Sequence, residues 1–140
     1  MADQTIREHG SILVVDDEPL VSEVLQEFFA DQGYAVDVAA TGHEAFRRAS
    51  SKRPDAVILD MGLPDTTGDQ LLTRLRTLDD SMQIVMLTGR LDAAAVHPSV
   101  ATGAVQYLHK PFDFEVIHRV VARAVETGRE RLAASRPPAR

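Results

Sequence analysis

Asp60 closes a short, wholly apolar run at residues 56–59, an unusual place for a charged side chain. A carboxylate there costs stability unless a ligand or a partner compensates it, so Asp60 is a candidate for chemistry. Asp16 and Asp17 follow a second apolar run, residues 12–15. An acidic pair ahead of a helix is, taken alone, more simply explained as a helix N-cap than as a ligand site.

A hydroxyl and an ammonium group stand at the ends of two further apolar runs. Thr88 follows residues 84–87, and Lys110 comes shortly after residues 104–108. Each has a simple explanation by itself, Thr88 as a strand-end residue and Lys110 as a solvated surface charge. If the four runs are parallel strands, however, their carboxyl ends meet at the edge where open α/β sheets bind ligands. The shared placement predicts one polar site.

The chemistry of that site follows from its charges. Carboxylates gathered at one edge repel one another, and a hard divalent cation with oxygen ligands removes the repulsion, so Mg²⁺ or Mn²⁺ is the expected cofactor. Mg²⁺ commonly binds one or two carboxylates together with phosphate oxygens, which suits the site to phosphoryl chemistry. An Asp carboxylate can itself form an aspartyl phosphate when a metal and a lysine screen the charge. Asp60 is the predicted acceptor and Lys110 the lysine.

Strands and amphipathic helices must alternate along the chain to position these residues. The apolar runs are short and continuous, as in strands covered on both faces, and residues 34–39 are expected as a further strand. Helices are expected after Pro19, after Thr41, around residues 71–78 and from Asp113 onward. This alternation predicts a doubly wound α/β fold, with a parallel sheet covered by helices on both faces.

Composition limits the class of protein. The 140 residues are 44% hydrophobic and 26% charged, the balance of one globular domain. The net charge of −6 argues against direct binding of nucleic acid. No cysteine, membrane-spanning run or signal-peptide core is present, so a cytoplasmic location is expected. We expect an N-terminal extension at residues 1–10, the domain at residues 11–127 and an arginine- and proline-containing flexible tail or linker at residues 128–140.

Four motifs together resemble the receiver domains of bacterial two-component response regulators. They are ILVVDDE at the acidic pair, VILDMGLPDTTG around Asp60, VMLTG with Thr88, and GAVQYLHKP with Tyr107 and Lys110. Each is weak alone, but four in this order across residues 11–125 are specific. The resemblance implies a flavodoxin-like, five-stranded sheet with strand order 2-1-3-4-5.

The resemblance also implies a role for each matching residue. Asp60 would accept the phosphoryl group, Lys110 would pair with the phosphoryl oxygens, and Thr88 and Tyr107 would move as the two parts of a conformational switch. Pro111 would follow a cis peptide bond. The metal ligands would be Asp17 directly, Asp16 mostly through metal-bound water, Asp60, and the backbone carbonyl of Gly62.

The partners implied by the resemblance are a sensor histidine kinase or phosphotransfer protein that donates from phosphohistidine and docks beside the site and the first helix. The downstream target or output domain stays open, as does a homodimer, and no contact with nucleic acid or membrane is expected. The chain's own histidines show no metal-ligand spacing and receive no role.

One segment departs from the family pattern, and two positions lie where the family controls the stability of the phosphoryl group. Pro98 falls inside the segment 91–102, where the family has its fourth helix, so that helix should be short, kinked or displaced. Gly62 and Arg90 lie where the family tunes the lifetime of the phosphoryl group by controlling the access of water.

Three functions remain open at this point. The first is a switch protein that is no enzyme beyond slow self-dephosphorylation. The second is a pseudo-receiver that binds partners without being phosphorylated, and it ranks lower because no acidic or lysine position is lost. The third is an aspartyl-phosphate hydrolase, which is disfavoured because Gly62 stands where such phosphatases carry a second catalytic Asp.

Overall fold

The computed structural model describes residues 9–89 and 105–134. These residues form a five-stranded parallel sheet with strand order β2-β1-β3-β4-β5. The strands are β1 (Ser11–Val15), β2 (Ala35–Ala39), β3 (Ala56–Asp60), β4 (Gln83–Thr88) and β5 (Val105–His109). The predicted doubly wound, flavodoxin-like arrangement is confirmed.

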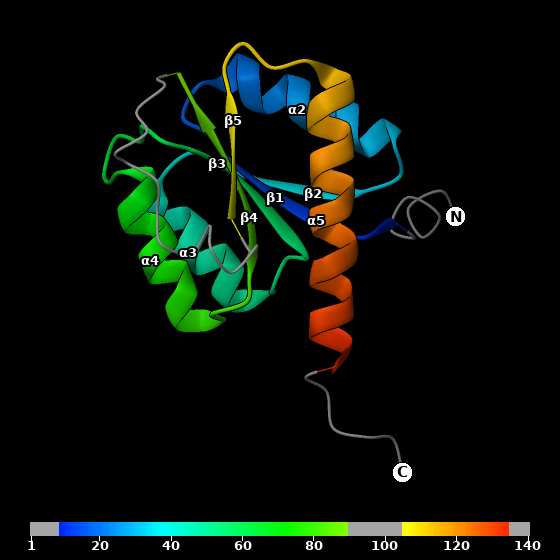
Figure 1. Ribbon diagram of the computed structural model, residues 1–140. Helices are drawn as coiled ribbons and strands as arrows, with labels where there is room; N and C mark the ends of the chain where they lie inside the picture. The colour runs from blue at the N-terminus through cyan, green and yellow to red at the C-terminus, as the bar shows by residue number, and fades with distance from the viewer. Residues whose placement is uncertain (1–8, 90–104, 135–140) are drawn as a thin grey trace.

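Helices cover both faces of the sheet. The helices α3 (Gly42–Ser51) and α4 (Gly68–Leu78) lie on one face, whereas α2 (Pro19–Asp31) and α5 (Phe114–Ala134) lie on the other (Figure 1). The predicted fourth helix, including Pro98, and the tuning position Arg90 lie outside the described residues. Within the described part of the chain, no helix is both long and apolar enough to cross a bilayer.

Alternation along the central strands divides the core into two clusters. Leu13 and Met86 belong to the cluster under α3 and α4, and their neighbours Val14 and Leu87 belong to the one under α2 and α5. Successive side chains of a strand point to opposite faces, so a strand that is covered twice must be apolar at every position. This explains why the apolar runs are continuous.

The ends of the helices follow local rules. Pro19 is the first residue of α2, where its missing N–H is not needed, and Gly33 after the helix takes a left-handed φ of 97°. Thr41 caps α3 by accepting a hydrogen bond from the Glu44 N–H at 3.1 Å. A full capping box between Thr67 and Gln70 begins α4.

The last helix is longer than predicted. Residues 128–134, assigned from the sequence to a flexible tail, continue α5 without interruption. Helix-favouring side chains fill residues 129–134, and the two prolines that suggested a linker, Pro137 and Pro138, come only after them. Gly128 packs against the backbone of Asp55, and a Cβ at that position would collide with the Asp55 carbonyl oxygen.

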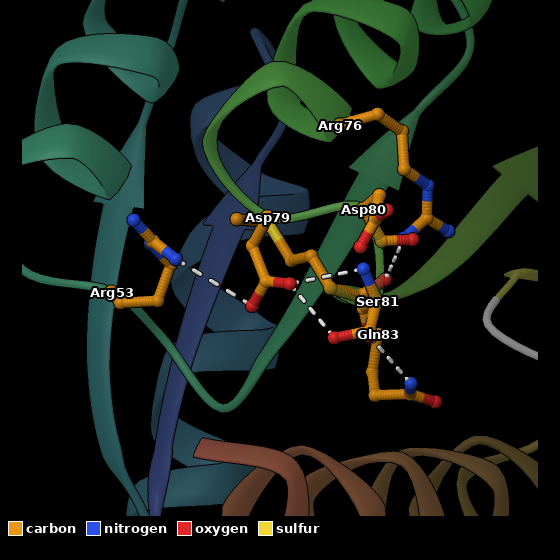
Figure 2. A network of polar contacts seen from close by, with 7 residues as sticks. Arg53, Arg76, Asp79, Asp80, Ser81 and Gln83 are labelled. Atoms are coloured by element: carbon orange, nitrogen blue, oxygen red, sulfur yellow. Dashed lines mark hydrogen bonds and ion pairs between the residues drawn. The ribbon is translucent and has the colours of Figure 1, made fainter. Parts of the chain in front are cut away.

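A polar network secures the end of the sheet where β4 starts (Figure 2). Asp79, which follows α4, accepts hydrogen bonds from the N–H and hydroxyl of Ser81 at 2.9 and 2.7 Å and pairs with Arg53 at 3.5 Å. The Arg76 guanidinium donates to the Met82 carbonyl at 2.6 Å. These contacts fix the turn from α4 into β4 and therefore the register of the strand that ends in Thr88.

Candidate functional site

The acidic pair follows β1 as predicted and has one buried and one exposed member. Asp16 is only 2% exposed, whereas Asp17 is exposed. One carboxylate oxygen of Asp16 accepts a hydrogen bond from the Glu18 N–H at 2.9 Å, as in an Asx turn leading into a helix. The other oxygen, Oδ2, is buried and has no hydrogen-bond partner. The N-cap of α2 is Glu18, with no side-chain capping bond, so the helix-capping explanation does not account for the Asp16 carboxylate.

Asp60 and Lys110 form a direct ion pair. The Lys110 Nζ lies 3.0 Å from Asp60 Oδ1, and Asp60 itself is 8% exposed. β5 and the residues after it place the lysine, because the Lys110 N–H donates to the Thr88 carbonyl at 2.8 Å. Burial opposes the lysine's charge, but the hydrogen bond and attraction of Asp60 outweigh it and raise the pKa of Lys110. The peptide bond from Lys110 to Pro111 is cis, as the resemblance implied.

The carboxylates of Asp16, Asp17 and Asp60 converge. One oxygen from each lies within 4.8 Å of the other two. Burial is the main cause that raises the pKa of the Asp16 carboxyl, and repulsion from Asp60 adds to it. A divalent cation would neutralise this repulsion and give the unpartnered Oδ2 of Asp16 a ligand, so the donor set fits a hard metal such as Mg²⁺.

Gly62 lies in the loop between β3 and α4, in an antiparallel bridge with Thr67. It is exposed, and no atom lies within 4 Å of the position that a Cβ would take there. The surroundings of Gly62 are therefore open.

The structure adds one residue that the sequence did not single out. The Asp65 carboxylate reaches across to the start of α3 and accepts hydrogen bonds from the N–H groups of Gly42 and His43 at 2.8 and 3.0 Å. These bonds hold the pKa of Asp65 below its usual value. Asp65 thus ties the loop after Asp60 to a second helix. Its sequence signal was only an acidic residue in a turn, which does not indicate a partner 22 or 23 positions away.

The two predicted switch residues occupy neighbouring strands. Thr88 ends β4 and is 9% exposed, one position beyond Leu87, which pairs with Asp60. Tyr107 is partly buried on β5, packed against the cluster under α3 and α4. Its hydroxyl donates to the Asp69 carboxylate at 3.3 Å. The structure thus gathers the carboxylates and Lys110, with Thr88 on the strand beside them and Tyr107 one strand further out.

Comparison with known proteins identifies the family. Residues 12–122 match the family described as the response regulator receiver domain. The chain belongs to this family. The receiver is 32% identical over 112 residues to the sporulation initiation phosphotransferase F of Bacillus subtilis, covering 80% of this chain and 90% of that protein. It is 39% identical over 104 residues to the response regulator MprA of Mycolicibacterium vanbaalenii, covering 74% of this chain.

Solved structures give the same family. The chemotaxis protein CheY4 of Vibrio cholerae superposes on this receiver with a TM-score of 0.75 and 30% identity, covering 82% of this chain and 98% of that one. A CheY-like receiver domain from Methanospirillum hungatei gives a TM-score of 0.76 at 26% identity, covering 86% and 98%. The chain spans only 45% of the MprA protein, so its similarity there is to one part of a longer relative.

Proposed function

We propose that this receiver accepts a phosphoryl group on Asp60 from a phosphohistidine of a sensor histidine kinase or phosphotransfer protein and then changes conformation. The observation that carries the proposal is the Asp60–Lys110 pair, held at 3.0 Å beside two further carboxylates. A stabilising ion pair alone would not need the extra acidic residues, which raise the electrostatic cost of the site. A phosphoryl acceptor that works with a cation needs both the lysine partner and the extra carboxylates.

In the transfer step, a carboxylate oxygen of Asp60 forms the new P–O bond while the P–N bond of the donor breaks. The electron pair of the broken bond stays on the departing imidazole nitrogen. Mg²⁺, held by Asp16, Asp17, Asp60 and the Gly62 carbonyl, would supply charge neutralisation at the phosphoryl oxygens. Lys110 would exchange its contact with Asp60 for one with a phosphoryl oxygen, and the Thr88 hydroxyl would donate to another.

An apolar surface next to the site supports docking of the donor. Leu20, three residues after Asp17, is 77% exposed, and Phe114, four residues after Lys110, is 41% exposed. A groove of about 370 Å³ next to Lys110 is lined by Leu20, Val21, Val24, Pro111 and Phe112. Large apolar side chains exposed together mark interaction sites more often than chance. A protein donor that covers this groove would bring its phosphohistidine to the adjoining edge of the sheet.

The cellular location, the output and the domain limits of the receiver belong to the same proposal. The receiver would act in the cytoplasm as a switch rather than a catalyst, with at most slow self-dephosphorylation. It would signal to a downstream target or output module, with homodimerisation as one route. The domain limits at residues 11–127 stay a prediction, with α5 continuing beyond them.

The test is intact mass after incubation with acetyl phosphate, with and without Mg²⁺, for the native chain and for Asp60→Asn. The expected result is one metal-dependent, base-labile phosphoryl adduct that is absent from the variant. Asp37→Asn, which removes an exposed carboxylate from β2, is the matched control and should be labelled like the native chain. No adduct on the native chain would instead support a pseudo-receiver, and an adduct that persists in Asp60→Asn would remove Asp60 as the acceptor.

A further inference from the structure

Tyr107 is hydrogen-bonded to Asp69, a carboxylate to which the proposed metal and phosphoryl chemistry assigns no role. Its hydroxyl donates to Asp69 Oδ1 at 3.3 Å, joining β5 to the first turn of α4 across 38 positions of sequence. Both side chains are partly buried. An acidic residue in the first turn of a helix is ordinarily explained by the helix dipole. The contact with Tyr107 gives Asp69 a second partner, on a strand.

The Tyr107 ring reaches Asp69 from across β4. In the sheet, Tyr107 pairs with Met86, and Met86 pairs with Leu59. All three pack in the cluster under α3 and α4. A Cβ at Gly68, the first residue of α4, would come within 2.9 Å of the Met86 Cε, so the start of α4 rests on this strand. Tyr107 therefore contacts α4 at the place where the helix meets the sheet.

The first turn of α4 is also tied to the backbone of Asp60. The Gly68 N–H donates to the Met61 carbonyl at 2.7 Å, and the Met61 N–H donates to the Leu87 carbonyl at 3.1 Å. A Cβ at Gly68 would lie 2.8 Å from the Met61 Cα and 3.1 Å from the Asp60 carbonyl oxygen. With no space between them, a shift of the peptide after Asp60 must be passed to Gly68 and so to Asp69.

We propose that Asp69 is a positioning residue that couples the orientation of Tyr107 to the phosphorylation state of Asp60 through the first turn of α4. This inference rests on the proposed function, because it assumes that Asp60 is the acceptor. The route runs from Asp60 through Met61 and Gly68 to Asp69, and it adds to any coupling that passes through Thr88. At 3.3 Å the contact exceeds the roughly 2.5–3.0 Å usual for an O–H···O bond. A displacement of a few tenths of an ångström would remove it.

Tyrosine fluorescence can measure the contact between Tyr107 and Asp69 directly, because the chain has two tyrosines and no tryptophan. Tyr34, the other tyrosine, is buried in the cluster on the opposite face of the sheet. In a Tyr34→Phe background the emission comes from Tyr107 alone. A carboxylate that accepts the phenol proton quenches this emission, so Asp69→Leu should brighten Tyr107 in the free protein. Asp69→Asn keeps an acceptor oxygen without the charge and should give an intermediate emission.

Coupling is read from the affinity for beryllofluoride with Mg²⁺, a non-covalent mimic of the phosphoryl group, measured by calorimetry. Asp69→Leu and Tyr107→Phe should each change the dissociation constant by about 2- to 10-fold, in the same direction. The double variant should change it no further than one single variant does, because both remove the same contact. Asp80→Leu removes an exposed carboxylate beyond the far end of α4 and should leave both the emission and the affinity unchanged.

The outcomes separate this inference from the function on which it rests. Failure of the unmodified chain to bind beryllofluoride would refute the proposed function. Equal Tyr107 emission with and without the Asp69 carboxylate would refute the contact. A dissociation constant that is unchanged in Asp69→Leu, or effects that add fully in the double variant, would overturn the coupling while leaving the acceptor role of Asp60 intact.

Discussion

The ionised carboxylate of Asp16 should make the metal-free receiver less stable, so Asp16→Asn should stabilise it. Asp16 is 2% exposed, and its Oδ2 has no hydrogen-bond partner. A buried polar atom that lacks a partner costs about 1–3 kcal/mol, more when it is charged. In the variant, the amide oxygen can still accept from the Glu18 N–H, and the new N–H₂ can donate toward Asp60. We expect a gain of about 1–2 kcal/mol in the free energy of unfolding in EDTA at pH 7.

The pH dependence of stability gives an independent check on the same residue. Burial, reinforced by repulsion from Asp60, raises the folded-state pKa of Asp16 above its ordinary value of 3.8. The folded protein then binds the proton more tightly than the unfolded chain does, so stability falls as pH rises from below 3.8 through the folded pKa. Asp16→Asn should remove this part of the pH profile.

Mg²⁺ should reverse the order of stability between the native chain and the variant. A ligand that binds only the folded state adds RT ln(1 + [L]/Kd), about 2.7 kcal/mol at 100 times Kd. The native chain should gain this amount, and Asp16→Asn should gain much less. Asp17→Asn is the matched control, because Asp17 is exposed. It should lose the response to Mg²⁺ without any gain in EDTA.

Urea unfolding in EDTA and in Mg²⁺ measures all of these quantities. If Asp16→Asn is less stable than the native chain in EDTA, the carboxylate is compensated by the protein itself, and the inference of a cation site from its unpartnered oxygen is wrong. An equal response to Mg²⁺ in all three proteins would place the cation elsewhere.

Three further predictions concern other parts of the molecule. Gly128→Ala should lower the free energy of unfolding by about 1–3 kcal/mol, because its methyl group meets the Asp55 carbonyl; a gain in urea unfolding, usual for Gly→Ala in helices, would contradict this packing. Burial raises the pKa of Asp79, but its hydrogen bonds and ion pair lower it more, so its stabilisation should disappear as pH falls below 3.8 toward the folded pKa. Asp79→Asn should therefore flatten the acid side of the stability profile, and an unchanged acid transition would count against the network. Lys110→Met, which removes the partner 3.0 Å from Asp60, should slow labelling by acetyl phosphate at least about tenfold in timed mass spectra; a rate within about twofold of the native rate would remove Lys110 from the proposed chemistry.

Much of the fold could be predicted because the buried strands have a recognisable sequence pattern. A strand covered on two faces must be apolar at each position, so residues 12–15 and 84–87 read as strands without any alignment. The polar residues after them then fall at one edge by topology alone. This is why Asp16, Asp60 and Lys110 could be placed together from the sequence.

Contacts between segments distant in sequence could not be predicted in the same way. Asp65 and Asp69 are acidic residues near a turn and a helix start, where local rules already explain them. Their partners, the start of α3 and Tyr107, are set by how helices pack on the sheet. The length of α5 was also underestimated, because composition marked residues 128–134 as a tail although Gly128 is buried against Asp55.

The close contact between Gly128 and the backbone of Asp55 gives α5 a candidate pivot point in its C-terminal third. The helix begins at Phe114, four residues after Lys110, and runs along the whole sheet to Ala134 (Figure 1). At 1.5 Å per residue, the pivot lies roughly 21 Å from the start of the helix and roughly 9 Å from its end. A tilt of the helix about this contact would have arms of unequal length. If a movement of Lys110 displaced the start of α5 by about 1 Å and the helix tilted about Gly128, Ala134 would be displaced by about 0.4 Å in the opposite direction.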